Sequence, residues 1–361
     1  MERYGSRTRR GVVGSLVLIG LLALGSVSFG QTTADLESAR RIDLPFSGDF
    51  DISSDEDVDY FRFQLPASRY GVEIVIDIDA DSRGSTLDSL MSLYDESGNE
   101  IAYDDDTDGR DPFISGPLVE GVYYIEVRGY SASAGAYTIT VESSPIEAES
   151  IRLPYVGTFE ISKGGERDIF VFDAEGGAYG QTVVIDIDAE SIESGLDSII
   201  YLYDERWQGI DYDDDTDGYD PYLRARVAQR TYYIVVEAYD EVTGPYTLKV
   251  DTEFIEPTSI ELPVSVQSEI AAAYEGDLYR IELRKDATIV IDIDAEAAGS
   301  SLDSYLYLYD DEWIEVTRDD DSDGSDSYIE ATLAAGIYFI EVKGYSDSTG
   351  DYTLTVETVN E

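Results

Sequence analysis

Aspartates at alternate positions, followed by a glycine, occur three times in the chain. The runs begin at Asp104, Asp213 and Asp319, and each reads Asp-x-Asp-x-Asp-Gly with a fourth aspartate two residues after the glycine. Alternating carboxylates, with a glycine that lets the backbone turn sharply, suit Ca²⁺, which prefers six to eight oxygen ligands at about 2.3–2.6 Å. Three runs at equivalent positions of a repeat predict a calcium loop in each copy.

Two further aspartates in each copy are expected at the same end of the fold as the loop. One ends a Val-Ile-Asp-Ile-Asp segment and the other lies in a Leu-Asp-Ser segment. If the strands run up and down, both reach the rim that the aspartate loop occupies. Like charges about 4 Å apart repel by about 4 kcal/mol per pair at an effective dielectric near 20, and a bound cation reverses that sign. The expected calcium ligands are Asp79, Asp88, Asp104, Asp106, Asp108 and Asp111 in the first copy, Asp188, Asp197, Asp213, Asp215, Asp217 and Asp220 in the second, and Asp294, Asp303, Asp319, Asp321, Asp323 and Asp326 in the third.

The third run also satisfies the spacing of an EF-hand, with Glu330 as its last ligand. The same position holds Ser115 in the first copy and Arg224 in the second. The flanking residues have the alternation of strands, whereas an EF-hand loop is flanked by helices. The sequence therefore predicts a calcium loop between strands.

The loops belong to a repeat of domain size. Asp77, Asp186 and Asp292 occupy the same position in successive copies, 109 and 106 residues apart. Each copy consists of short alternating segments broken by Gly, Asp, Ser and Pro, without a helical period, which is typical of β-sandwiches. We expect three sandwich domains at residues 42–143, 151–252 and 260–361, after a linker at residues 31–41.

The order of motifs resembles the bacterial pre-peptidase C-terminal domain, a family related to the collagen-binding domains of clostridial collagenases. The motifs in the first copy are an acidic residue before an aromatic strand (Asp59-Tyr-Phe-Arg-Phe), Leu87-Asp-Ser with Leu93-Tyr-Asp, Gly121-Val-Tyr-Tyr-Ile, and Gly135-Ala-Tyr-Thr. The resemblance covers nearly all of residues 42–361. It implies a jelly-roll-like antiparallel β-sandwich, found in secreted proteins, often beside an enzyme and often with calcium. The second copy departs from the pattern at Gln229–Thr231 and at Ala238.

The first 30 residues have the composition of a signal peptide. Four arginines precede an apolar run from Val12 to Leu24, and small residues follow at Ser28 and Gly30. Cleavage after Gly30 predicts an exported protein, periplasmic, at the cell surface or extracellular. The apolar run is nearly long enough to span a bilayer, so an uncleaved anchor is the alternative.

Composition excludes several classes of function. The formal net charge is −53, which disfavours nucleic acid and anionic membrane surfaces as partners. The chain has no His and no Cys, so Ser-His-Asp, Cys-His and histidine-ligated zinc sites are unavailable. Three equivalent acid clusters also differ from the distinct acid and base environments that a catalytic site needs. The sequence predicts a protein that is not an enzyme.

Tyrosine is also in excess, at 29 residues. One side of the strand after Leu-Asp-Ser becomes more aromatic along the chain, with Tyr201 and Tyr203 in the second copy and Tyr305, Tyr307 and Tyr309 in the third. An exposed tyrosine ladder can bind an extended polymer, such as an extracellular polysaccharide or a fibrous protein. The alternative is that another strand or a neighbouring domain covers these rings.

The sequence as a whole predicts an exported, non-catalytic calcium-binding repeat protein, acting as a binding, adhesion or structural element. One alternative is the accessory region of a secreted hydrolase system whose enzyme is another chain. The other is a salt-adapted acidic surface protein without specific metal sites, because 77 acidic against 24 basic residues is also how such a surface looks.

Overall fold

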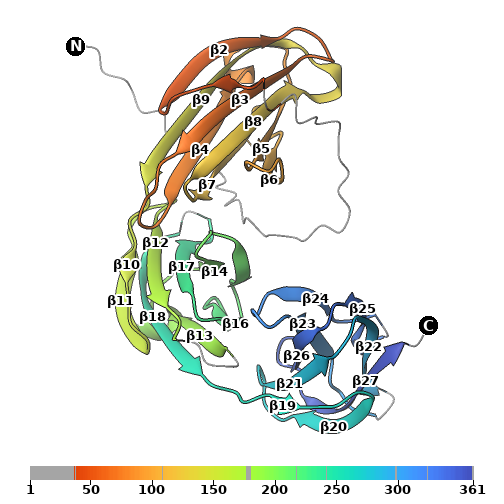
Figure 1. Cartoon of the computed structure of the whole chain (residues 1–361). Helices are drawn as coiled ribbons and strands as arrows, with labels where there is room; N and C mark the ends of the chain where they lie inside the picture. The colour runs from red at the N-terminus through yellow and green to blue at the C-terminus, as the bar shows by residue number, and fades with distance from the viewer. Residues whose placement is uncertain are drawn as a thin grey trace.

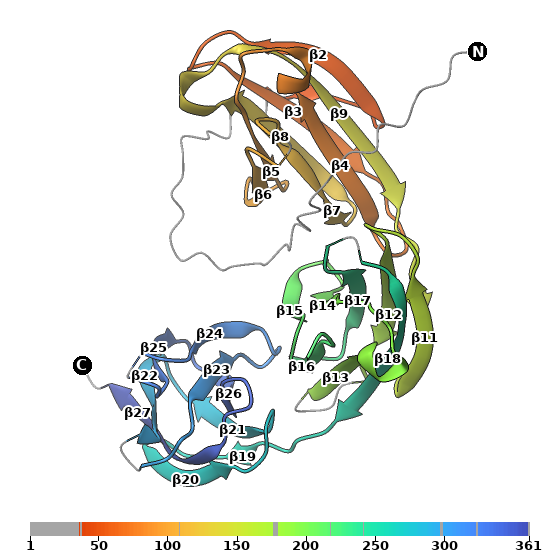
Figure 2. The same ribbon diagram turned by 180° about the vertical axis from the view of Figure 1, so that it is seen from behind.

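The computed structural model describes residues 36, 38–107, 109–175, 180–216, 218–240, 242–296, 299–322 and 324–359. The predicted signal peptide lies outside the described residues. Within them, no helix has the length and apolar character that crossing a membrane requires. The described chain forms three β modules that follow one another along an arc, module 1 at residues 40–145, module 2 at 149–253 and module 3 at 258–359 (Figures 1 and 2).

The described part of each module contains nine strands in the same order along the chain. Module 1 has β1 (Arg40–Arg41), β2 (Phe46–Ile52), β3 (Val58–Leu65), β4 (Val72–Asp79), β5 (Ser89–Tyr94), β6 (Glu100–Asp104), β7 (Phe113–Leu118), β8 (Gly121–Gly129) and β9 (Gly135–Pro145). Module 2 has β10 (Glu149–Ser150), β11 (Tyr155–Ile161), β12 (Arg167–Asp173), β13 (Gln181–Asp188), β14 (Ser198–Asp204), β15 (Gly209–Asp213), β16 (Tyr222–Val227), β17 (Thr231–Ala238) and β18 (Gly244–Glu253). Module 3 has β19 (Thr258–Ser259), β20 (Val264–Ile270), β21 (Gly276–Leu283), β22 (Ala287–Asp294), β23 (Ser304–Tyr309), β24 (Glu315–Asp319), β25 (Tyr328–Leu333), β26 (Gly336–Gly344) and β27 (Gly350–Val359). Short 3-10 helices are η1 (Asp81–Arg83), η2 (Tyr130–Ala132) and η3 (Glu190–Ile192).

The strands of each module form two packed sheets with the jelly-roll order. In module 1 the four-stranded sheet is β2-β9-β4-β7 and the five-stranded sheet is β1-β3-β8-β5-β6, and modules 2 and 3 repeat this arrangement. The short first strand pairs parallel with β3, and the other pairs of module 1 are antiparallel. The prediction of three tandem jelly-roll-like sandwiches is confirmed.

Alternation of side chains builds a separate core in each module. Along β4, for example, Ile74, Ile76 and Ile78 are fully buried while Asp77 and Asp79 lie on the outer face. Period-2 alternation of this kind is what a strand needs when one face packs on the opposite sheet. The core residues of the three modules form three distinct hydrophobic clusters, so each module has its own hydrophobic core.

A buried hydrogen bond joins the two sheets of each module. In module 1 the hydroxyl of Tyr137, on β9, donates to Asp59, on β3, over 2.6 Å. The equivalent pairs are Tyr246 with Asp168 and Tyr352 with Asp277, each at 2.6 Å. Burial is the main cause that raises the pKa of Asp59 and of Asp168. Two of the sequence motifs of each repeat, the acidic residue before the aromatic strand and the final Gly-x-Tyr-Thr, therefore meet in one bond.

The two tryptophans of the chain hold the modules together. Trp207 follows β14 in a turn of module 2, is 2% exposed, and donates its indole N–H to the carbonyl of Tyr70 in module 1 over 2.9 Å. Its ring stacks on Tyr233 of its own module, with 4.1 Å between centroids. Trp313 occupies the equivalent turn of module 3 and stacks on Phe339 at 4.2 Å. Both junctions are therefore packed interfaces rather than free linkers.

The junction turn explains where glycine and tryptophan fall. Trp207 and Trp313 have φ of 61° and 62°, and module 1 has Gly98 at the same position, with φ of 81°. On the other side of each junction, a Cβ added to Gly71 or Gly180 would lie 2.7 Å from the indole nitrogen of the facing tryptophan. Glycine at these two positions lets the backbone approach the ring.

Candidate metal site

The aspartate loop, the end of β4 and the segment before β5 meet at one rim of each module. In module 1 the carboxylate of Asp111 accepts hydrogen bonds from the backbone N–H groups of Ala80 and Asp81, both at 3.0 Å. The N–H of Ser89, next to Asp88, donates to the carbonyl of Arg110. The prediction that residues more than thirty positions apart converge on one rim is confirmed.

Asp111 and its equivalents cap the backbone turn after the β4 strand. Asp111, Asp220 and Asp326 are 3%, 6% and 6% exposed. Asp220 accepts from the N–H groups of Ala189 and Glu190, and Asp326 does the same in module 3. A buried carboxylate needs such donors, so these three aspartates have a structural role whether or not they also bind a metal.

The first aspartate of each loop accepts hydrogen bonds from residues at or just after the loop. Asp104 accepts from the hydroxyl of Thr107 at 2.7 Å and from the N–H of Phe113 at 2.8 Å. Asp213 and Asp319 make the same contacts in modules 2 and 3. These carboxylates fix the loop conformation, which presents the next aspartate outward. Asp106, Asp215 and Asp321, at that second position, are exposed.

The strand-end aspartates reach the rim on the outer face of the four-stranded sheet. Asp79, Asp188 and Asp294 follow the outer face of the four-stranded sheet, because they alternate with buried isoleucines. Asp188 forms an ion pair with Lys249 of the neighbouring strand, and Asp79 accepts a hydrogen bond from Ser82. The alternation that buries the isoleucines turns these aspartates to the sheet face, and their role as calcium ligands stays a prediction.

A different acidic residue, which the sequence reasoning missed, lies beside the loop glycine. In module 2, a Cβ added to Gly218 would lie 3.0 Å from Glu190, and in module 3 one added to Gly324 would lie 2.8 Å from Glu296. The equivalent acid in module 1 is Asp81, which would lie 3.9 Å from a Cβ added to Gly109. The signal was present, because an acid directly follows the Ile-Asp-Ala segment in every copy.

Carboxylates crowd the rim of module 2. Partial burial, and then the charges of Asp215 and Asp240, raise the pKa of Asp197. Burial and the neighbouring charges of Asp215 and Asp213 likewise raise the pKa of Asp214. Like charges that raise each other's pKa favour binding of a proton or of a cation.

Module 1 differs because an arginine enters its rim. Arg110, which follows the loop glycine, pairs with Asp81, and this contact, with smaller effects of Asp88 and Asp111, raises the pKa of the arginine. The same position is Tyr219 in module 2 and Ser325 in module 3. The rim of module 1 therefore already has a positive charge that the other two loops lack at this position.

The donor set suits a hard cation, since it consists of carboxylate and backbone oxygens. The third aspartate of each loop, Asp108, Asp217 or Asp323, lies outside the described residues. Among the residues that are described, no three acidic side chains form a group that could hold a metal ion. Asp88, Asp197 and Asp303 are half-buried beside the loop, and their carbonyls accept the N–H groups of the tyrosines at 130, 239 and 345.

The strands on either side of the loop exclude an EF-hand. In module 3 the loop joins β24 to β25, and Glu330, the last position of the EF-hand pattern, lies in the middle of β25. The prediction of a loop between strands is confirmed.

The tyrosine ladder is covered by the neighbouring module. Tyr201 and Tyr203 are 6% and 5% exposed, and they pack with Trp207 and with Tyr70 of module 1. Tyr309 is 8% exposed at the second junction, while Tyr305 and Tyr307 are half-buried. The burial of Tyr201, Tyr203 and Tyr309 favours the alternative that a neighbouring domain covers these rings, because the face that carries them is the face on which the preceding module docks.

Comparisons with known proteins agree with this architecture. The sequence profile of the bacterial pre-peptidase C-terminal domain matches residues 57–129 and 275–344, within modules 1 and 3. Module 2 has the same strand order, and its motifs differ at Gln229–Thr231 and Ala238. The three modules thus define a tandem jelly-roll protein. Modules 1 and 3 each contain a match to the pre-peptidase C-terminal domain, and module 2 shares their strand order.

Individual relatives match this chain to very different extents, and this chain spans only about a tenth of the length of the curated protease that it matches. A probable subtilase-type serine protease of Deinococcus radiodurans is 40% identical over 73 residues, which are 20% of this chain and 10% of the protease. The pre-peptidase C-terminal domain of a collagenase from Bacillus anthracis is 17% identical, covers 29% of this chain and 98% of that domain, and has a TM-score of 0.26. An archaeal virus protein described as a triple jelly roll is 9% identical, covers 82% of this chain and 81% of its own, and has a TM-score of 0.20.

Proposed function

We propose that this protein is an exported, non-catalytic accessory protein whose three modules form a stiff, calcium-stabilised arm. The observation that carries the proposal is the combination of packed tryptophan junctions with the same acidic rim in every module. Packed junctions hold successive modules in fixed relative positions, which suits a spacer or a binding scaffold. The 73 residues shared with a subtilase-type protease favour action beside a secreted hydrolase.

The calcium part of the proposal rests on the chemistry of the rim. The ligands would be the outward aspartate of each loop, Asp106, Asp215 or Asp321, with the aspartate before β5 and the acid beside the loop glycine. These groups come from segments far apart in sequence, so a cation could bring them together only in the folded module, with a shift of the exposed loop aspartate toward the other two. Calcium that binds only the folded state stabilises it by linkage, by about 2.7 kcal/mol at a free concentration one hundred times Kd.

Module 1 should bind calcium more weakly than modules 2 and 3. The guanidinium of Arg110 pairs with Asp81, so a metal ion would have to displace it or share the carboxylate. Serine at the same position of module 3 imposes no such competition. Arg110→Ser should therefore strengthen calcium binding to module 1 by about tenfold, which corresponds to about 1.4 kcal/mol.

Calorimetric titration of the chain from residue 31 with CaCl₂ tests the proposal. The triple variant Asp106→Asn, Asp215→Asn, Asp321→Asn should lose most of the binding heat and the calcium-dependent rise in melting temperature. The matched control removes three exposed acids from the turn at the opposite end of each module, with Glu96→Gln, Glu205→Gln and Asp311→Asn. Equal loss in both variants would mean that calcium only screens the surface charge, as in a salt-adapted protein.

A further inference from the structure

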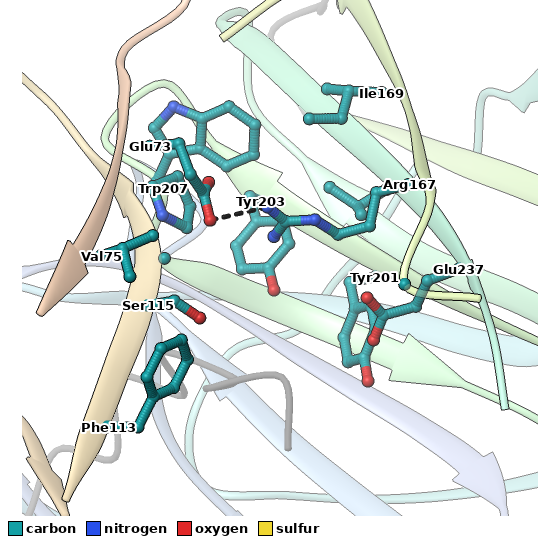
Figure 3. A pocket seen from close by; sticks show the side chains of 14 residues that line it. Glu73, Val75, Phe113, Ser115, Arg167, Ile169, Tyr201, Tyr203, Trp207 and Glu237 are labelled. Carbon is teal, nitrogen blue, oxygen red and sulfur yellow. Dashed lines mark ion pairs between the residues drawn. The ribbon is translucent and has the colours of Figure 1, made fainter. Parts of the chain in front are cut away.

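A cavity of about 220 Å³ lies between modules 1 and 2. Module 2 contributes Tyr201, Tyr203 and Trp207 as an aromatic wall, together with Arg167 and Glu237. Module 1 contributes the facing side, which includes Glu73, Ser115 and Pro117 (Figure 3). Glu73 and Arg167 both line this space and form an ion pair of 2.7 Å across the junction.

The second junction has the same aromatic wall, but there cationic side chains of the chain itself lie against it. The guanidinium carbon of Arg226 lies 5.7 Å from the ring centre of Trp313, and the ammonium of Lys343 lies 4.9 Å from the ring centre of Tyr307. Both distances are within the range of cation–π contacts. Both cations also pair with Glu341, at 3.2 and 3.5 Å.

The strand registers relate the two junctions position by position. In module 2, Arg226 on β16 pairs with Thr182 on β13. The equivalent pair in module 1 is Pro117 on β7 with Glu73 on β4, so module 1 has a proline at the position of the arginine. Glu237 occupies the position of Lys343, because β14 and β23 pair with their neighbours in the same register. At these two positions the first junction has a proline and a carboxylate in place of two cations. Its own cation, Arg167, stands where module 3 has Gly276 and is paired with Glu73.

The lining of the first cavity has a net negative charge. Its charged side chains are Glu73, Glu237 and Arg167, two acids and one base. Glu237 is 9% exposed and interacts with the hydroxyl of Tyr201, and a carboxylate has lone pairs for more than one donor. An aromatic wall beside a mostly buried carboxylate is an environment that attracts a flat cation.

We propose that this cavity binds a guanidinium group, presented by an arginine side chain of a basic partner protein. Trp207, Tyr203 and Tyr201 would contact its faces, as Trp313 contacts Arg226 in the second junction. The carboxylate of Glu237 would accept its N–H groups. The strongly acidic surface of this chain would raise the local concentration of such a partner. The proposed site uses none of the proposed calcium ligands, and the tests are done in EDTA so that calcium binding does not contribute to the result.

Ligand-observed NMR with the chain from residue 31 tests the proposal in 150 mM salt. Ethylguanidinium should bind with a Kd of about 1–10 mM, as a single weakly held group would. Ethylurea, which has the same shape without the charge, should not bind. An arginine-containing tripeptide should bind at least as well if the source is a protein side chain; binding of ethylguanidinium alone would limit the site to small guanidines and would overturn the protein-partner part.

Two variants and one control locate the site. Glu237→Gln should weaken ethylguanidinium binding about tenfold, whereas Glu205→Gln, an exposed acid of the same module, should leave it unchanged. Pro117→Arg should supply an internal guanidinium, as in the second junction, and abolish binding while the melting temperature is kept or raised. Equal binding of ethylurea, or wild-type binding by Glu237→Gln, would overturn the proposal, and neither result would bear on calcium.

Discussion

Replacing Gly71 by alanine should open the junction between modules 1 and 2. The new Cβ would lie 2.7 Å from the indole nitrogen of Trp207 and 2.9 Å from the carbonyl oxygen of Leu118, and real Cβ atoms do not come this close to their neighbours. Gly71 also has φ of 89°, which costs an L-residue about 1–2 kcal/mol. Overpacking adds about 1–3 kcal/mol, so the expected loss of stability is about 2–5 kcal/mol.

Gly84→Ala is the matched control for the cost of placing an alanine at a position with positive φ. Gly84 has φ of 76°, and no atom lies within 4 Å of its added Cβ. It should therefore lose only about 1–2 kcal/mol. Urea unfolding measures the difference between the variants, and small-angle scattering should show a longer maximum dimension for Gly71→Ala alone. Equal losses of stability with identical scattering would refute the view that the tryptophan fixes this junction.

The remaining predictions concern buried polar groups within the modules. Tyr137→Phe removes the hydroxyl that donates to Asp59, so module 1 should lose about 1.5–3 kcal/mol in urea unfolding, the usual value for a hydrogen bond to a charged group; an unchanged midpoint would contradict the importance of this bond. Asp220→Ala leaves the N–H groups of residues 189 and 190 without their acceptor and should cost about 1–3 kcal/mol, which calorimetry of the melting transition would detect. Burial raises the pKa of Tyr232 from 10 to about 12, so its contribution to stability is complete below pH 10 and is lost as the pH rises from 10 through about 12. Ultraviolet titration should show tyrosines that ionise only with unfolding, and simple ionisation of all 29 tyrosines near pH 10 would contradict this.

Most of the fold was predictable because its determinants are local. Alternation such as that of Ile74, Ile76 and Ile78 specifies a strand and its buried face, and glycine with aspartate marks the turns. The repeat then supplied the same information three times. The convergence of the aspartate loop with the segments around residues 80 and 88 also followed, because adjacent antiparallel strands return to the same end of a sandwich.

The arrangement of the modules was not predictable in the same way. Whether Tyr201 and Tyr203 are exposed depends on which face the preceding module covers, and no local pattern records that choice. The two tryptophans were the available signal, because Trp207 and Trp313 stand where module 1 has Gly98. A large aromatic residue at a turn with positive φ is strained, so its presence indicates that contacts with another module compensate for that strain.

Individual side-chain roles at the rim were also ambiguous in the sequence. A carboxylate in an Asp-x-Asp pattern can bind a metal or accept backbone hydrogen bonds, and the residue type is the same. Asp104 and Asp111 accept hydrogen bonds from their own loop and from the turn at residue 80. Asp79 is a similar case, because its carboxylate accepts a hydrogen bond from Ser82 and its place on the strand does not by itself distinguish that role from metal binding.

The central claim is that calcium binds the folded modules at their acidic rims. The most direct measurement is a calorimetric calcium titration of the chain from residue 31, repeated with Asp106→Asn, Asp215→Asn and Asp321→Asn together. The account predicts about three saturable sites, a calcium-dependent rise in melting temperature, and loss of both in the triple variant. Weak uptake that sodium chloride abolishes, or saturable binding that survives in the triple variant, would contradict it.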